Sequence, residues 1–250
     1  MNTQIFSRSK SLNLIPERKL TEKQRAVAAN CAQCSALNIN WNEESSADGL
    51  CAKCVVKYTA YNRWYSSNIP VEYWDLRMEK DFIGFEGLLT QYQEFTKDVR
   101  NVYLTGKSIC LVGQCGTGKT MTINCVLKKA ALASFQCLYT TLSDVVATLT
   151  SADTEDKFLA RRELLTVDFL AIDEVDNRFF NQSASSNELF VRSFEAIIRT
   201  RLQNNLPTLL ATNSPNLQES FAPSFRESLG SLMSKIPNFI VIGQDHRKIV

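Results

Sequence analysis

The sequence has no run of about 18 apolar residues, so it predicts no transmembrane helix and no membrane partner. Residues 1–14 also lack a long apolar stretch and the cleavage pattern of a signal peptide. We therefore expect a cytoplasmic protein whose eight cysteines stay reduced. Histidine occurs only once, at His246, and a lone histidine is a poor candidate for metal binding or acid–base chemistry.

Length and charge suggest more than one part. The 250 residues are 44% hydrophobic, enough for a full core and a second small module. Net charge is only +2, but residues 1–30 carry six basic and two acidic side chains, a local +4. This basic arm could contact nucleic acid or an acidic partner. A solvated terminal segment is the alternative.

Four of the cysteines form two C-x2-C pairs, which indicate a metal site at Cys31, Cys34, Cys51 and Cys54. Four thiolates give a closed tetrahedral zinc site, and a short segment without its own core needs such a staple. Four reduced thiols or an iron–sulfur cluster are the alternatives. The other four cysteines lie singly among apolar residues, and we expect small buried side chains at Cys110, Cys115, Cys125 and Cys137.

A helix is expected over residues 55–66, closing a zinc module that spans residues 31–67. Its aromatic residues recur at helical spacing, at Tyr58, Tyr61, Trp64 and Tyr65. They could stack on single-stranded DNA, but a packed helix face is the more ordinary interpretation. Asn68-Ile69-Pro70 then breaks the chain, and we place the boundary of the main domain, residues 68–250, there.

The main domain alternates short apolar runs with helical patterns. A helical pattern covers residues 81–105. Strands are expected at 108–112, 137–140, 169–172, 208–211 and 239–242, with helices over 120–133 and 187–202 among those between them. This order predicts an α/β fold in which a parallel sheet is flanked by helices on both faces.

A phosphate-binding loop is expected at residues 113–120, where the sequence GQCGTGKT fits G-x4-G-K-[ST] between a strand and a helix. The glycines let backbone N–H groups curl around phosphate oxygens, and the helix dipole adds to this. Lys119 would reach the β- and γ-phosphates, and Thr120 would ligate Mg²⁺. The other loop residues that would hold the nucleotide are Gly113, Gly116, Thr117 and Gly118.

Two further strands end in polar residues. The run at 167–174 ends in Asp173 and Glu174, and buried carboxylates at a strand end need a cation or water. Asp173 would hold Mg²⁺ and Glu174 would polarise the attacking water. Asn213 follows the strand at 207–212 and could bond the γ-phosphate or that water. A surface acidic turn and an Asx turn are the respective alternatives.

Together, these motifs resemble the Walker A, Walker B and sensor 1 elements of AAA+ ATPases. The segments NIP (68–70), LAIDE (170–174), Arg201 followed by LPTLLATN (206–213), and GQDHR (243–247) are similar to DnaC/DnaI-type replicative helicase loaders. The IstB-type transposition ATPases share this core. The resemblance covers residues 68–250 and implies a P-loop AAA+ domain that uses ATP and self-associates.

The resemblance also implies roles for residues near the carboxyl end. Arg247 occupies the place of the terminal arginine and could act like sensor 2. The segment 229–236 resembles the one that carries the arginine finger in loaders, but this chain has Lys235 there. Lysine keeps the charge and loses the bidentate fork. Arg226 lies nearby and could substitute, and hydrolysis would be weak if neither acts.

The leading hypothesis is therefore an ATPase that loads a hexameric replicative helicase onto single-stranded DNA. In DnaI-like loaders a small zinc domain contacts the helicase, which suggests the same role for the cysteine module. One alternative is an IstB-type transposition ATPase that assembles on duplex DNA for a transposase. Another is a partner-binding adaptor that keeps ATP only as a structural ligand.

Overall fold

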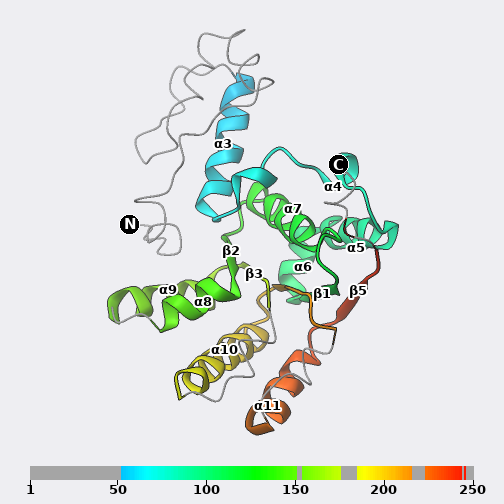
Figure 1. Ribbon diagram of the computed structural model, residues 1–250. Helices are drawn as coiled ribbons and strands as arrows, with labels where there is room; N and C mark the ends of the chain where they lie inside the picture. Colours follow the sequence, from blue (N-terminus) through cyan, green and yellow to red (C-terminus); the bar gives the residue numbers. More distant parts are fainter. Residues whose placement is uncertain (1–51, 151–153, 176–184, 216–222, 244, 246–250) are drawn as a thin grey trace.

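The computed structural model describes residues 52–150, 154–175, 185–215, 223–243 and 245 (Figure 1). The basic arm, Cys31, Cys34, Cys51, His246 and Arg247 lie outside these residues. Cys54 is placed only by its position in the first described helix. Among the described helices, none has the length and apolar character needed to cross a membrane.

Five parallel strands form the sheet, in the order β2-β3-β4-β1-β5. Their bounds are β1 Ile109–Gly113, β2 Cys137–Thr141, β3 Phe169–Asp173, β4 Thr208–Thr212 and β5 Asn238–Val241. The five strands expected from the sequence are therefore confirmed to within a residue at each end. Because every strand is parallel, all carboxyl ends meet at one edge of the sheet.

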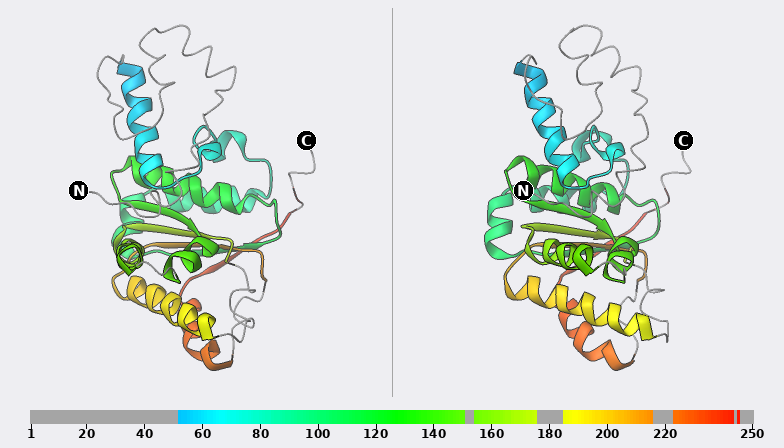
Figure 2. Two further views of the ribbon diagram at one scale, coloured as in Figure 1. Left: turned by 60° about the vertical axis from the view of Figure 1, so that its left-hand side comes forward. Right: turned by 90° about the vertical axis from the view of Figure 1, so that its left-hand side faces the viewer.

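Each face of the sheet is covered by its own helices. On one side lie α3 (Ala52–Ser66), α5 (Glu86–Thr96), α6 (Val99–Thr105) and α7 (Lys119–Leu132). On the other lie α8 (Leu142–Leu149), α9 (Thr154–Thr166), α10 (Ser185–Gln203) and α11 (Pro223–Met233) (Figure 2). Side chains alternate between the two cores along a strand, so Leu111 joins the first and Val112 the second. The predicted α/β architecture, with a parallel sheet between helices, is confirmed.

The helical pattern over 81–105 was expected as one stretch, and that expectation is wrong in part. Residues 82–85 lie outside the helices, between α4 (Met78–Asp81) and α5. A second break separates α5 from α6. There the Asp98 side chain accepts a 3.0 Å hydrogen bond from the Asn101 N–H and caps the new helix. The apolar periodicity of the sequence continues across Asp98, but the Asp98 side chain starts a new helix there.

Helix α3 packs onto α7 through its aromatic residues. Tyr61 is buried, and its ring lies 5.4 Å from Trp64 and 5.0 Å from Trp74 between centroids. The Arg63 guanidinium donates to the carbonyl oxygens of Ala131 and Leu132, at the end of α7, at 3.1 and 2.7 Å. For Tyr61 and Trp64 the packed-face interpretation of the aromatic residues is thus confirmed over DNA stacking. The side chain of Tyr58 lies outside the description.

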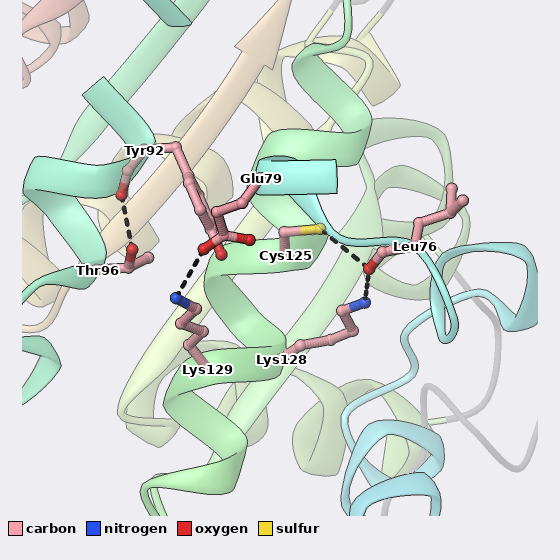
Figure 3. A network of polar contacts seen from close by, with 7 residues as sticks. All are labelled: Leu76, Glu79, Tyr92, Thr96, Cys125, Lys128 and Lys129. Carbon is pink, nitrogen blue, oxygen red and sulfur yellow. Dashed lines mark hydrogen bonds and ion pairs between the residues drawn. The ribbon is translucent and has the colours of Figure 1, made fainter. Parts of the chain in front are cut away.

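A buried lysine fastens the segment between α3 and α5 to α7. The segment includes η2, a short 3₁₀ helix (Val71–Tyr73). The Lys128 ammonium donates to the carbonyl oxygens of Tyr73 at 2.6 Å and Trp74 at 3.1 Å, and also to that of Leu76 (Figure 3). Burial lowers the pKa of Lys128. The three carbonyls compensate for the lost hydration, so the segment is fixed along the helix that follows the phosphate loop.

Arg201, which is fully buried, fixes the edge of the sheet opposite to the phosphate loop. Its guanidinium donates to the carbonyl oxygens of Leu164, Val167 and Pro207 at 2.8–2.9 Å, and Nε donates to the Thr208 hydroxyl at 3.0 Å. Burial lowers its pKa to about 9, which still leaves it charged at neutral pH. One side chain thus joins the ends of α9 and α10 to the starts of β3 and β4.

Replacing Arg201 by methionine should lower the free energy of unfolding by about 2–3 kcal/mol, because several buried carbonyls lose their donor. Urea denaturation followed by circular dichroism measures this change. Arg199→Met is the matched control, since Arg199 lies on the exposed side of α10 and pairs with Glu195 at 2.6 Å. That loss should stay within about 0.5 kcal/mol. Equal effects of the two substitutions would contradict the structural role of Arg201.

Candidate nucleotide-binding site

The loop at residues 113–119 joins β1 to α7 in a conformation that needs glycine. Gly116 and Gly118 have φ of +74° and +93°, in the left-handed region. The neighbours also leave no room for a side chain. A Cβ at Gly113 would lie 2.4 Å from the Val241 carbonyl oxygen, and one at Gly118 would lie 2.4 Å from the Phe82 ring. The backbone is therefore held in a tight curl directly before a 14-residue helix that no side chain caps.

Lys119 turns its side chain back into this curl. The residue is only 6% exposed. Its ammonium donates to the carbonyl oxygens of Gly113 at 2.8 Å and Gln114 at 2.6 Å. The Thr117 hydroxyl donates to the same Gln114 oxygen at 2.9 Å. Thr120 follows in the first turn of α7 and is half-buried. The loop thus places a cation at its centre and a hydroxyl beside it.

One expectation for the loop is wrong. Cys110, Cys125 and Cys137 are buried as predicted, but Cys115 is exposed. It lies between Gln114 and Gly116 in the loop that follows β1, outside the buried strand. The apolar residues before Cys115 belong to β1, which ends at Gly113. They therefore did not indicate whether Cys115 is buried.

The acidic pair lies at the carboxyl end of β3. Asp173 is 4% exposed, and its Oδ1 accepts a 2.8 Å hydrogen bond from the Glu174 N–H. Its Oδ2 accepts a 3.1 Å hydrogen bond from the Tyr139 hydroxyl. Glu174 is exposed and has a φ of +52°, an uncommon conformation for a residue with a side chain. The pair therefore divides into a fixed, buried carboxylate and an accessible one.

Asn213 follows β4, which lies between β3 and β1 in the sheet. Asn213 is exposed, while the preceding Thr212 is buried and donates to the Val175 carbonyl oxygen at 2.6 Å. Strand order thus brings the phosphate loop, Asn213 and the acidic pair to consecutive strand ends at one edge of the sheet. The sequence placed each at a strand end and did not give their order across the sheet.

These residues fit a nucleoside triphosphate with Mg²⁺. A tight glycine curl at a helix start, with a lysine at its centre, is suited to phosphate oxygens. The hydroxyl of Thr120 and the carboxylate of Asp173 are the hard oxygen ligands that Mg²⁺ takes. Within the described part of the chain, no group of three or more His, Cys, Asp or Glu residues could hold a metal ion by itself. The predicted zinc ligands fall mostly outside that part.

The sequence missed three neighbours of the site: Tyr139, Phe82 and Asp245. An Asp245 carboxylate oxygen lies 1.7 Å from where a Cβ of Gly116 would be, and the Phe82 ring lies against Gly118. Tyr139 reaches Asp173 from the adjacent strand. All three contacts join distant parts of the chain, so no local spacing indicates them.

The candidates for an arginine finger lie elsewhere. Lys235 is exposed and precedes β5, so it lies at the opposite edge of the sheet from the chain's own phosphate loop. Arg226 belongs to the first turn of α11, and its side chain lies outside the description.

One protein-family model matches part of the chain. Residues 109–229 match the AAA model, the ATPase family associated with various cellular activities. This range contains the phosphate loop, the acidic pair and Asn213, and it indicates an AAA ATPase domain. No curated protein matches the sequence.

Several solved structures have a similar fold. DnaI is 17% identical, with a TM-score of 0.56 over 70% of this chain and 94% of its own. The DnaC helicase loader is 16% identical, with a TM-score of 0.55 over 69% of this chain and 100% of its own. The replication initiator DnaA bound to AMPPCP and single-stranded DNA is 16% identical, with a TM-score of 0.54 over 69% of this chain. The match spans about half the length of the DnaA chains. At these identities the likeness establishes the fold alone.

Proposed function

We propose that this chain is an ATPase that loads a hexameric replicative DNA helicase onto single-stranded DNA. ATPase activity is supported by one observation. The phosphate loop, Asn213 and the acidic pair occupy consecutive strand ends at one edge of the sheet. Support for loading comes from the similarity to DnaI and to the DnaC helicase loader, most or all of whose chains are covered.

The loop residues would bind ATP. Backbone N–H groups around Gly113, Gly116, Thr117 and Gly118 would surround the phosphates, and Lys119 would exchange its loop carbonyls for phosphate oxygens. Such an exchange is favourable because charge-assisted bonds to phosphate are stronger than those to neutral carbonyls. Arg247, outside the described residues, is the candidate for a further cationic contact.

Thr120 and Asp173 would hold Mg²⁺, whose charge neutralises the phosphate oxygens when bound. Glu174 would orient and polarise the attacking water, and its exposure at the strand end gives it access to solvent. Asn213, from the strand between, would hydrogen-bond the γ-phosphate or the water. Most of the chemistry is positioning, which suits residues held at the ends of buried strands.

Self-association would complete the site. Lys235, at the far edge of the sheet from its own loop, is suited to act on the nucleotide of an adjacent copy, as is Arg226. The zinc module of Cys31, Cys34, Cys51 and Cys54 would grip the helicase. The basic arm adds charge suited to DNA.

The test is assembly with a hexameric replicative helicase, measured by size-exclusion chromatography with and without ATP. We expect co-elution, and a rise in the amount of helicase on circular single-stranded DNA when ATP is present. A Cys51→Ser/Cys54→Ser double variant should lose the complex while it keeps ATP affinity within about 2-fold, since neither cysteine belongs to the phosphate loop. Absence of any complex would contradict the loader proposal. ATP-dependent coating of duplex DNA would favour an IstB-type ATPase.

A further inference from the structure

We propose that Tyr139 is a positioning residue for Asp173, and that the junction at Ser67–Asn68 holds Tyr139, so that the N-terminal segment acts on the magnesium ligand. This inference rests on the proposed function, because it assumes that Asp173 binds Mg²⁺ beside ATP. It concerns the Tyr139 hydroxyl, the Asn68 amide and the Ser67 carbonyl, to which the sequence motifs assign no role at the magnesium site.

Strand register brings the Tyr139 ring to Asp173. Tyr139 pairs with Ala171, and Thr141 pairs with Asp173, so Asp173 lies two residues farther along the same face. Ala171 is small and buried, which leaves room for the ring to lie along the neighbouring strand. The hydroxyl then donates to Asp173 Oδ2 at 3.1 Å, with both residues buried. This face of the sheet is also the one that α7 covers, and α7 carries Thr120.

The bond restricts how the carboxylate can turn. Tyr139 holds Oδ2, and the Glu174 N–H holds Oδ1 at 2.8 Å. Both partners donate to the carboxylate, so together they fix its orientation. Burial and the nearby carboxylate raise the pKa of Tyr139, which keeps the hydroxyl protonated as a donor. Groups of this kind orient metal ligands without touching the metal.

The backbone of the same tyrosine is held from the other side. β2 is an edge strand of the described sheet, and its outer edge meets the residues after α3. The Tyr139 N–H donates to the Ser67 carbonyl oxygen at 2.8 Å, and the Asn68 side-chain amide donates to the Tyr139 carbonyl oxygen at 2.9 Å. Asn68 adopts a φ of +55°, which asparagine tolerates better than most residues.

The junction is also fixed to α3. The Ser67 hydroxyl donates to the Arg63 carbonyl oxygen at 2.7 Å, and the Arg63 guanidinium bonds the end of α7. One continuous set of hydrogen bonds therefore runs from α3 through Tyr139 to Asp173. A partner that displaces α3 would release β2 and loosen the Asp173 carboxylate. Binding of a partner to α3 would therefore change magnesium binding at the nucleotide.

The experiment titrates MgCl₂ into the full-length protein with a fluorescent ATP analogue, mant-ATP. In Tyr139→Phe, which removes only the hydroxyl, the half-saturating Mg²⁺ concentration should rise about 10-fold. Analogue binding in EDTA should stay within about 2-fold of wild type. Asn68→Ala should shift the Mg²⁺ titration in the same direction by about 2- to 3-fold, since the backbone bond at Ser67 remains.

Tyr103→Phe is the matched control. The nearby Asp168 carboxylate raises the pKa of Tyr103, and Asp168 directly precedes β3, at the end of the strand opposite to Asp173. The control should titrate like wild type. A half-saturating Mg²⁺ concentration of Tyr139→Phe within 2-fold of wild type would overturn the positioning role of Tyr139. An unchanged Mg²⁺ titration of Asn68→Ala would overturn the role of the Ser67–Asn68 junction. A wild-type protein that binds no mant-ATP would contradict the proposed function itself, and that result is seen before any variant is compared.

Discussion

Lys119→Ala is expected to weaken ATP binding by about 200- to 1,000-fold, which corresponds to about 3–4 kcal/mol. The ammonium is buried at the centre of the loop and bonds two loop carbonyls at 2.6–2.8 Å. Its loss removes the only side-chain cation that the described loop directs inward, so phosphate charge would meet backbone dipoles alone. Isothermal titration calorimetry with ATP and MgCl₂ measures the change.

The control must separate a lost ligand contact from a damaged helix. Lys129 belongs to the same helix, α7, but is exposed and pairs with Glu79 at 3.0 Å. Lys129→Ala should leave ATP affinity within about 2-fold, because an exposed pair contributes under about 1 kcal/mol and lies far along the helix. Both variants should keep the wild-type circular dichroism spectrum. An ATP affinity of Lys119→Ala equal to that of wild type would overturn the nucleotide site as a whole.

Local periodicity predicted the strands and most helices because each buried strand is a short continuous apolar run. In a parallel sheet with both faces covered, every residue of a central strand is buried, as in Phe169–Asp173. The phosphate loop was equally readable, since a glycine curl between a strand and a helix requires specific residues at fixed spacing. The break before Val99 was missed because Asp98 caps a helix inside an apolar pattern that favours continuity.

Contacts between distant segments could not be read in the same way. The position of β4 between β3 and β1 decides that Asn213 lies between the loop and the acids. The order of strands depends on the packing of the whole sheet. The contacts of Arg201 and Tyr139 have the same character, because neither segment indicates which residues these side chains bond. Their partners lie 37 and 34 residues away in Leu164 and Asp173, so only the folded sheet reveals them.

The sequence predicts a boundary between the zinc module and the main domain at residues 68–70, directly after α3. The break at Asn68-Ile69-Pro70 is present as a turn, yet the residues on either side of it contact the main domain. Ile69 is buried in the core beneath α7, and Tyr61 of α3 joins the same cluster. Helix α3 is therefore packed against the main domain, which a flexible linker would not be.

Glu174→Gln is expected to lower the rate of ATP hydrolysis by about 10²- to 10⁴-fold, because glutamine keeps the shape of the side chain and loses the base that polarises water. Glu174 is exposed with a φ of +52°, and the substitution leaves its backbone N–H bonded to Asp173. ATP affinity should therefore stay within about 3-fold of wild type. A coupled phosphate-release assay measures turnover, and mant-ATP fluorescence measures binding.

Turnover and binding together distinguish an ATPase from an adaptor that keeps ATP as a structural ligand. Only catalysis depends on the accessible Glu174 carboxylate. Glu94→Gln, on an exposed position of α5, is the control and should turn over ATP at the wild-type rate. Should the Glu174→Gln protein hydrolyse ATP as fast as wild type, Glu174 is not the base. Should wild type itself bind ATP tightly without turnover, even with its helicase and DNA, the nucleotide acts as a structural ligand. A rate that collapses at constant affinity excludes that role, since a ligand needed only for structure requires no group to activate water.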